Sequence, residues 1–345
     1  MTLPAGTRRW PLHPPPAPGE ALTSWVARLA APYGMTPGYL LRHGLGEASA
    51  LLDDPRAGDL DFDPPAGILR ALAERTGTDP GLVRLTTIAG WVPWLADSLD
   101  PYDGQEAFDA YVRQHSVLLA PSEAGSSTVP HWVPWIRVHD EEWRTESRVC
   151  PACFADPARG TSLLAMLPVM TTCAEHGLPL QTEIAVRLAA IDHDPEASPP
   201  PAPGPGAAMD RLTFEGVATG MVTLPGRPLH VGVWFRLLRT LLDEVSMPAS
   251  RVRTRSAAAL AKVWAATGRP PRGGLTVWRP YERLDLPLQQ AMLEAAANAL
   301  SLAATGEITA CGTLGRCLAP NRTAPSTKET ARHGKTSRPG PSARR

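Results

Sequence analysis

The residues of this sequence best suited to hold a metal ion are Cys150, Cys153, Cys173 and His176. They form two pairs, Cys-x-x-Cys and Cys-x-x-His, with 19 residues between the pairs. A gap of two residues lets both side chains of a pair converge on one ion, and zinc favours four sulfur and nitrogen ligands in a tetrahedron. We therefore predict one bound zinc ion, held by two hairpin-like half-sites.

The predicted zinc ion has a structural role. Three thiolates and a neutral imidazole leave the loaded site with a net charge of about −1. Because the protein fills all four coordination positions, a catalytic water has no place to bind. We expect the ion to fold residues 148–180, which have little aliphatic core of their own. The alternative is that these are incidental buried cysteines beside an unrelated histidine.

Motifs of common enzymes are missing from the sequence. There is no Gly-x-Ser-x-Gly, no phosphate-binding loop and no His-Glu-x-x-His. The acidic run over residues 53–63 suggests a magnesium nuclease or an exposed loop, and the interspersed Pro, Gly and Leu favour the loop. A zinc hydrolase would require an open coordination position. Cys311 and Cys317 have no second pair nearby, and we interpret them as free thiols in a mobile segment.

Short helices are expected to position the N-terminal part of the chain. Leu22, Trp25, Val26 and Leu29 fall on one helical face. Thr36 is a suitable N-cap for a second helix that begins at a proline.

This pattern recurs downstream, because Gly34-x-x-Pro37-Gly38 is matched by Gly77-x-x-Pro80-Gly81. Both units are interpreted as helix, short turn and helix, compatible with a DNA-binding helix-turn-helix. Two short helices in a row also occur in any helical domain, so the spacing alone does not establish DNA binding.

Two tryptophan pairs, Trp91-x-x-Trp94 and Trp132-x-x-Trp135, are interpreted as core anchors, with an interface hot spot as the alternative. A proline precedes the second tryptophan of each pair, which favours extended or turn structure. After a proline-rich stretch, three amphipathic helices are expected, around Trp234–Leu242, Ala258–Trp264 and residues 287–304.

The sequence is therefore expected to be mainly helical, with helix-turn-helix-like units, a small central zinc module resembling a zinc ribbon, and a C-terminal helical domain. The expected parts are a proline-rich lead-in (1–18), a helical region (19–118), the zinc module (119–192), a proline-rich linker (193–208), a helical domain (209–305) and a basic, disordered tail (306–345).

The chain has a net charge of zero, but its charges are segregated. Residues 47–110 have a net charge of −9, residues 251–283 of +7, and residues 320–345 of +6. The basic regions could contact phosphate or simply form a solvated surface. The candidate nucleic-acid contacts are Arg42, Arg251, Arg253 and Arg255.

The compartment is inferred from what the sequence lacks. It contains no apolar stretch of 18 residues and no signal peptide at its N-terminus. We expect a cytoplasmic protein, in which cysteines favour metal binding over disulfides.

Two segments resemble the TniQ family, which includes the TnsD-type target selectors of bacterial transposons. One segment is residues 18–30, close to the N-terminal opening of that family. The other joins Arg148-Val149-Cys150-Pro151-Ala152-Cys153 to Cys173-Ala174-Glu175-His176-Gly177-Leu178-Pro179-Leu180. The resemblance covers roughly residues 11–181. Residues 160–166, between the cysteine pairs, lack the aromatic side chains common in that family.

The resemblance implies an accessory transposition protein that is not an enzyme. Such proteins help a separate transposase and ATPase choose an insertion target, by binding DNA or by docking onto a targeting complex, and some act as dimers. The four metal-site residues take the family's zinc-ligand positions, and Trp25 and Leu29 take core positions. The alternatives are a docking adaptor with little DNA contact and a domesticated DNA-binding regulator.

Overall fold

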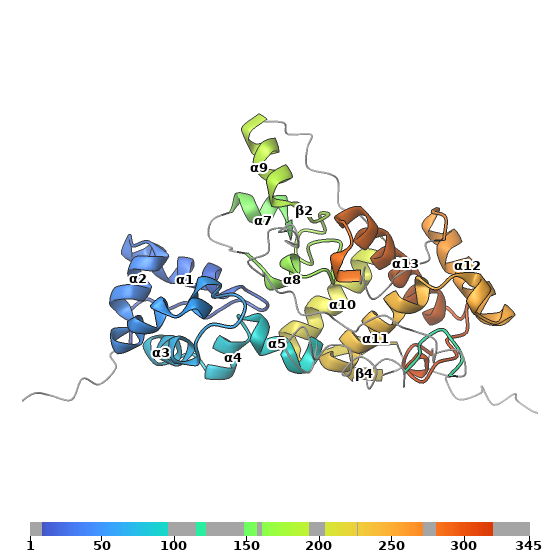
Figure 1. Cartoon of the computed structure of the whole chain (residues 1–345), viewed down its shortest axis with the longest axis horizontal. Helices are drawn as coiled ribbons and strands as arrows, with labels where there is room; N and C mark the ends of the chain where they lie inside the picture. Colours follow the sequence, from blue (N-terminus) through green and yellow to red (C-terminus); the bar gives the residue numbers. More distant parts are fainter. Residues whose placement is uncertain are drawn as a thin grey trace, which may run out of the picture.

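The computed structural model describes residues 9–95, 115–121, 148–156, 161–192, 204–225, 227–271 and 281–319. This part of the chain is mainly helical, as predicted, with two short two-stranded sheets. Figure 1 shows an elongated arrangement, with α1 to α4 at one end, α12 and α13 at the other, and α9 projecting between them. Among the helices described, none is both long and apolar enough to cross a membrane.

The first helical unit follows the expected pattern. It contains α1 (Leu22–Ala30), the 3-10 helix η1 (Ala31–Tyr33) and α2 (Pro37–Gly44). The Thr36 hydroxyl accepts a hydrogen bond of 3.2 Å from the backbone N–H of Tyr39 and so caps α2.

The second unit repeats this arrangement. The 3-10 helices η2 (Gly46–Asp53) and η3 (Pro55–Gly58) lead to α3 (Ala66–Thr76) and α4 (Pro80–Arg84). Asp79 caps α4 by accepting from the backbone N–H of Gly81 at 2.8 Å. The glycines that end the first helix of each unit, Gly34 and Gly77, have φ values of +65° and +68°, which other residues rarely adopt.

The two N-terminal units share a hydrophobic core that is separate from the core of the rest of the molecule. Trp25 and Leu29 of α1 are fully buried in it, as the sequence indicated. Its other buried members are Leu22, Val26, Ala30, Leu40, Leu41, Leu45, Ile68, Leu72, Ala73 and Val83.

The first tryptophan pair lies in helix α5 (Ile88–Leu95), so the expectation of extended or turn structure there is wrong. Trp91 is fully buried, and its indole N–H donates to the backbone oxygen of Leu85 at 2.8 Å. Its ring centroid lies 6.5 Å from that of Phe235. Packing of Trp91 against the main core therefore outweighs the local preference imposed by Pro93. Trp132 and Trp135 lie outside the described residues.

The C-terminal part consists of helices and one small hairpin. Its elements are α10 (Pro205–Thr219), β3 (Met221–Leu224), β4 (Arg227–His230), α11 (Val231–Val245), η7 (Ala249–Arg251), α12 (Thr254–Thr267), η8 (Tyr281–Arg283) and α13 (Leu286–Ala304). Strands β3 and β4 pair antiparallel. Helix α11 lies at the centre, since twelve of its fifteen residues are buried.

Two boundaries differ from those inferred from composition. Helix α10 begins at Pro205, inside the proline-rich stretch, because proline suits the first turn of a helix. Residues 306–318, which the composition assigned to the tail, pack on the core and include the 3-10 helix η9 (Gly315–Cys317). Ile308 and Leu318 are buried there. Cys311 and Cys317 are free thiols, as expected, but both are half-buried.

Residues 115–119 lie between this C-terminal segment and α11. The backbone N–H of Gly312 donates to the oxygen of Val117 at 2.9 Å. On the other side, the carboxylate of Glu244 accepts from the N–H groups of Val117 and Leu118 at 2.9 and 2.6 Å. Burial raises the pKa of Glu244 to about 8 despite these hydrogen bonds.

Candidate metal centre

The four predicted ligands come together in a small module between the two helical parts. Cys150 follows β1 (Arg148–Val149) and immediately precedes α7 (Pro151–Ala155), which carries Cys153. The first pair therefore sits on the opening turn of a short helix, and the prediction of a hairpin there is wrong. Pro151 suits this position because the first helical residue needs no N–H donor.

The second pair lies in a tight turn. The backbone N–H of Gly177 donates to the oxygen of Cys173 at 2.8 Å and closes the turn that carries His176. Strand β2 (Gln181–Thr182) follows and pairs antiparallel with β1, with Arg148 opposite Thr182. This ladder brings residues more than twenty positions apart into one site. The module also contains α8 (Leu163–Met166) and α9 (Glu183–Asp192).

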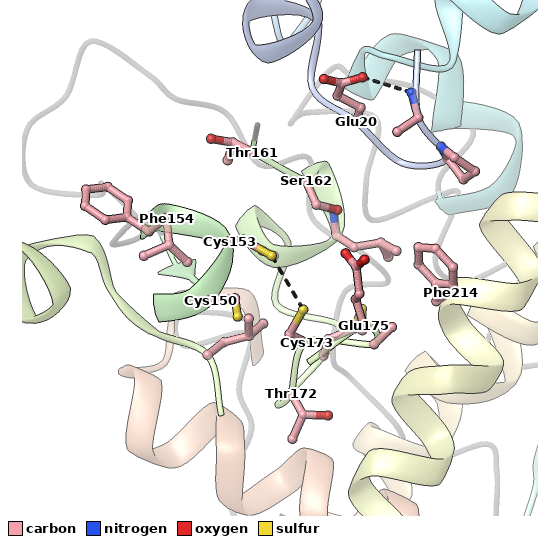
Figure 2. A pocket seen from close by; sticks show the side chains of 18 of the residues that line it. Glu20, Cys150, Cys153, Phe154, Thr161, Ser162, Thr172, Cys173, Glu175 and Phe214 are labelled. Carbon is pink, nitrogen blue, oxygen red and sulfur yellow. Dashed lines mark hydrogen bonds between the residues drawn. The ribbon is translucent and has the colours of Figure 1, made fainter. Parts of the chain in front are cut away.

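The distances between the ligand atoms fit a tetrahedral zinc ion. The Sγ atoms of Cys150, Cys153 and Cys173 lie 3.6, 3.3 and 3.6 Å from Nδ1 of His176. The Sγ atoms of Cys153 and Cys173 are 3.8 Å apart (Figure 2). Bonds of about 2.3 Å to sulfur and 2.0 Å to nitrogen predict separations of about 3.8 Å between sulfurs and 3.5 Å between sulfur and nitrogen.

The three thiols also perturb one another's pKa values. Hydrogen bonds from Cys150 and Cys153 lower the pKa of Cys173, whereas contacts with Cys150 and Cys173 raise the pKa of Cys153. Without a metal, one thiolate would therefore be stabilised at the expense of its neighbours. A divalent cation at the centre allows all three to be thiolates. The donor set and its geometry thus suit a structural zinc ion held by the four residues.

A carboxylate from the C-terminal part supports the second half-site. Oδ2 of Asp210, on α10, accepts hydrogen bonds from the N–H and hydroxyl groups of both Thr171 and Thr172, at 2.7 to 3.1 Å. These threonines directly precede Cys173. Asp210 is fully buried, and desolvation raises its pKa to about 6.

Two further buried side chains hold the segment that leads to these threonines. The Tyr281 hydroxyl donates to the backbone oxygen of Pro168 at 2.7 Å. Arg148 donates through Nη1 to the backbone oxygen of Met170 at 3.2 Å, and burial lowers its pKa. Side chains from β1, α10 and η8 therefore hold the segment that leads into the turn of Cys173 and His176.

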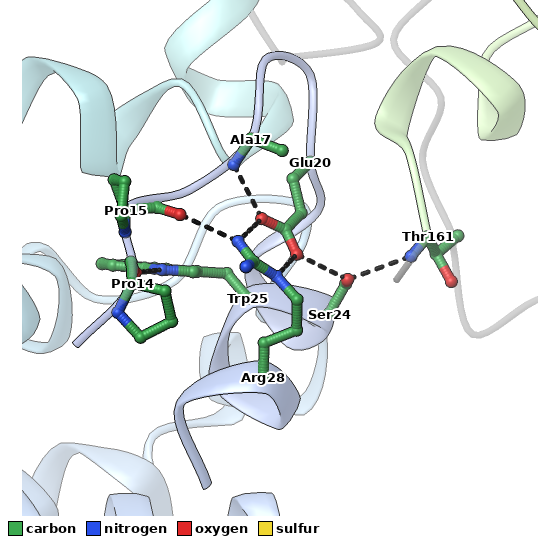
Figure 3. Close-up of polar contacts among 8 residues, drawn as sticks. All are labelled: Pro14, Pro15, Ala17, Glu20, Ser24, Trp25, Arg28 and Thr161. Atoms are coloured by element: carbon green, nitrogen blue, oxygen red, sulfur yellow. Dashed lines mark hydrogen bonds and ion pairs between the residues drawn. The ribbon is translucent and has the colours of Figure 1, made fainter. Parts of the chain in front are cut away.

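On its other side, the module is joined to the first helical unit through Glu20 (Figure 3). The Glu20 carboxylate accepts from Nε and Nη2 of Arg28, both at 2.7 Å, and from the hydroxyl of Ser24 at 3.0 Å. Ser24 in turn accepts from the N–H of Thr161 at 3.0 Å, and Ala21 donates to the oxygen of Thr161 at 2.9 Å. The hydrogen bonds that Arg28 donates to Glu20 raise the pKa of Arg28.

The four candidate nucleic-acid contacts do not form one surface. Arg42 is exposed on α2, with Nη2 3.5 Å from Oδ1 of Asp53. Arg251, Arg253 and Arg255 are exposed where η7 leads into α12. Figure 1 places α2 and α12 at opposite ends of the molecule.

Sequence reasoning missed Asp210 and Glu20. The signal for Asp210 was present, since it shares a helical face with Met209, Thr213 and Val217, all of which are buried. A charged residue on an apolar face indicates a buried partner. Glu20 precedes α1, whereas Arg28 lies in the last turn of α1. Helical spacing alone therefore does not reveal their contact.

Comparisons with known proteins agree with this site. The sequence model of the TniQ family matches residues 11–180, which include all four metal-site residues. No protein with a curated description and no solved structure gives a significant match.

Proposed function

Since residues 11–180 of this chain belong to the TniQ family, we propose that the protein helps a separate transposase and ATPase to select a target site. TniQ proteins are transposition-associated accessory proteins, and the match over residues 11–180 supports such a role for this chain. The observation that carries the proposal is the group of four cysteine and histidine side chains, which lies wholly inside the matched region.

The metal centre supports an architectural role. With four protein ligands, a bound zinc ion keeps no open position for substrate or water. Its ligands are connected through Asp210 to the C-terminal helices, and through residues 161–163 to the first helical unit. The ion would therefore fix the relative positions of two parts of the molecule that contact other macromolecules.

We propose that DNA contacts the start of α12. Three arginines lie within five residues there, and all are exposed. The backbone N–H groups at the start of this 14-residue helix add partial positive charge on the same side. Arginines so arranged suit phosphate groups, with little dependence on base sequence.

Docking onto a protein partner is the second candidate for the N-terminal end. Exposed Arg42 on α2 lies beside Asp53, and Glu47 is exposed nearby. This mixed charge favours a protein surface over a phosphate backbone. Tyr39, on the same face of α2, is 54% exposed and offers an aromatic contact.

A salt titration of DNA binding tests the proposal. We expect a duplex to bind with an affinity that falls as salt rises, with a log–log slope of about −0.9 per phosphate neutralised. Replacement of Arg251, Arg253 and Arg255 by Ala should lower the number of neutralised phosphates, as calculated from that slope, by two to three. Arg227→Ala, an exposed control on β4, should leave the slope unchanged. A complete lack of DNA binding at low salt, together with co-purification of an ATPase, would favour the docking role instead.

A further inference from the structure

A cavity of about 610 Å³ lies beside the metal centre, and its walls come from the N-terminal arm, the metal module and α10 (Figure 2). All three cysteines of the centre, Cys150, Cys153 and Cys173, line this cavity. Buried structural cysteines are inert because no reagent reaches their sulfur, whereas partly exposed thiolates react. The cavity therefore gives small molecules a path to the sulfur atoms that would hold the ion.

The three cysteines differ in accessibility. Cys150 is buried, with 3% of its surface exposed, whereas Cys153 and Cys173 are half-buried. The Sγ atoms of Cys153 and Cys173 lie 3.8 Å apart, and they must approach by about 1.8 Å to form a disulfide. Cys153 belongs to α7 and Cys173 to the turn that ends at Gly177, so this bond would join the two half-sites.

The other two cysteines provide an internal comparison. Cys311 and Cys317 are also half-buried free thiols, but neither is among the residues that line the cavity or form the cluster. A bound zinc ion keeps the sulfurs of the centre as thiolates, which is the form that reacts with peroxide. Among the described cysteines, those of the centre thus combine an access path, a neighbouring sulfur and the reactive form.

We propose that the metal centre is a modification site for hydroperoxides, which oxidise Cys153 and Cys173 to a disulfide and so release zinc. One of the two sulfurs attacks an oxygen of hydrogen peroxide; an S–O bond forms, the O–O bond breaks, and hydroxide leaves. The second sulfur attacks the resulting sulfenic acid; the S–S bond forms and a second hydroxide leaves. In sum, two thiolates, one peroxide and two protons give one disulfide and two waters.

The oxidised centre keeps only Cys150 and His176 as ligands. Two ligands hold zinc much more weakly than four, so oxidation and loss of the metal are linked. The turn after Thr172 then retains its hydrogen bonds to Asp210 but loses the contribution of the ion. This redox control of the metal module goes beyond the proposed part in target selection and does not depend on it.

The test uses the zinc-loaded full chain with Cys311 and Cys317 replaced by Ser, beside the wild type. A chromogenic chelator follows zinc release after hydrogen peroxide is added, and mass spectrometry of alkylated peptides maps the disulfide. We expect zinc release to parallel formation of a bond between Cys153 and Cys173, while Cys150 stays alkylated. Zinc retained after oxidation of the centre, a disulfide that contains Cys150, or a chain without zinc before peroxide is added overturns the proposal.

Two variants test the path through the cavity. Ala165→Trp, in α8, places an indole in the cavity and should slow zinc release at least about fivefold. Ala66→Trp, at an exposed position at the start of α3, should react at the wild-type rate. If Ala165→Trp fails to fold, Ala17→Trp, at an exposed position in the cavity wall, serves instead. A rate that is unchanged when the cavity is filled overturns the proposal.

Discussion

Oδ2 of Asp210 lies 2.7 Å from both the backbone nitrogen and the hydroxyl oxygen of Thr172. Asp210 is outside the region that matches the TniQ family, whereas Thr172 is the residue before a metal ligand. The C-terminal helices therefore contribute directly to the shape of the metal centre.

Replacing Asp210 should weaken both folding and zinc binding. Asp210→Ala leaves the N–H and hydroxyl groups of two threonines without their acceptor, which costs about 1–3 kcal/mol for each buried donor left unpaired. Zinc affinity should fall about 10–100-fold, as is typical when a group that orients ligands is lost. Chelator competition and thermal melts measure the two effects. Arg211→Gln, at an exposed position on the same helix, is the control; a zinc affinity equal to wild type in Asp210→Ala would contradict this role.

Metal content should depend on the clustered cysteines and not on Cys317. We expect elemental analysis to give one zinc per chain, and Cys150→Ser to lose the ion together with the fold of residues 148–180. Cys317→Ser keeps the cluster intact and should retain the full zinc content. In zinc-finger peptides the ion contributes about 10–16 kcal/mol to folding, so chelation of the wild type should lower its melting temperature markedly. Protein purified without chelator and free of stoichiometric metal would refute the site.

The Glu244 carboxyl predicts a defined pH dependence of stability. Its pKa is about 8 in the folded protein and 4.5 in its ordinary state, so between these values the folded chain holds a proton that the unfolded chain has lost. Its contribution to stability therefore falls as pH rises from about 5 to 8. The stability difference between wild type and Glu244→Gln, from denaturant melts, should shrink between pH 5.5 and 8.0. Glu307→Gln, an exposed position, should show no such change, and a difference that grows with pH would be inconsistent with this sign.

The hydrogen bonds of Glu20 predict that this side chain helps to hold the first helical unit against the metal module. Glu20→Gln removes the charge that binds Arg28, and we expect a loss of about 1.5–3 kcal/mol in the free energy of unfolding. Asp54→Asn breaks the exposed pair with Arg56 and should have no measurable effect. Chemical denaturation compares the two variants. Equal small effects would show that Glu20 contributes no more than a surface ion pair.

Much of this structure was accessible from sequence because local signals decide it. The cap at Thr36, the repeated Gly-x-x-Pro-Gly and the ligand spacing each act over a few residues. Trp91 shows the limit of such reasoning, since its contact with Phe235 joins positions far apart in the chain and determines the helix around it. The same holds for residues 306–318, whose glycines and lack of helical periodicity concealed the close backbone contact of Gly312 with Val117. A side chain at Gly312 would place Cβ only 2.1 Å from the backbone of Ser116.

The separate core of the two N-terminal units has a consequence for motion. Since Leu22, Trp25 and Ile68 pack in a cluster distinct from the main core, α1 to α4 can open as one cooperative group while α10 to α13 stay folded. Backbone amides of the two groups would then exchange with deuterium at different rates. If a partner docks at the N-terminal end as proposed, local opening of that end would regulate the binding while α10 to α13 stay folded.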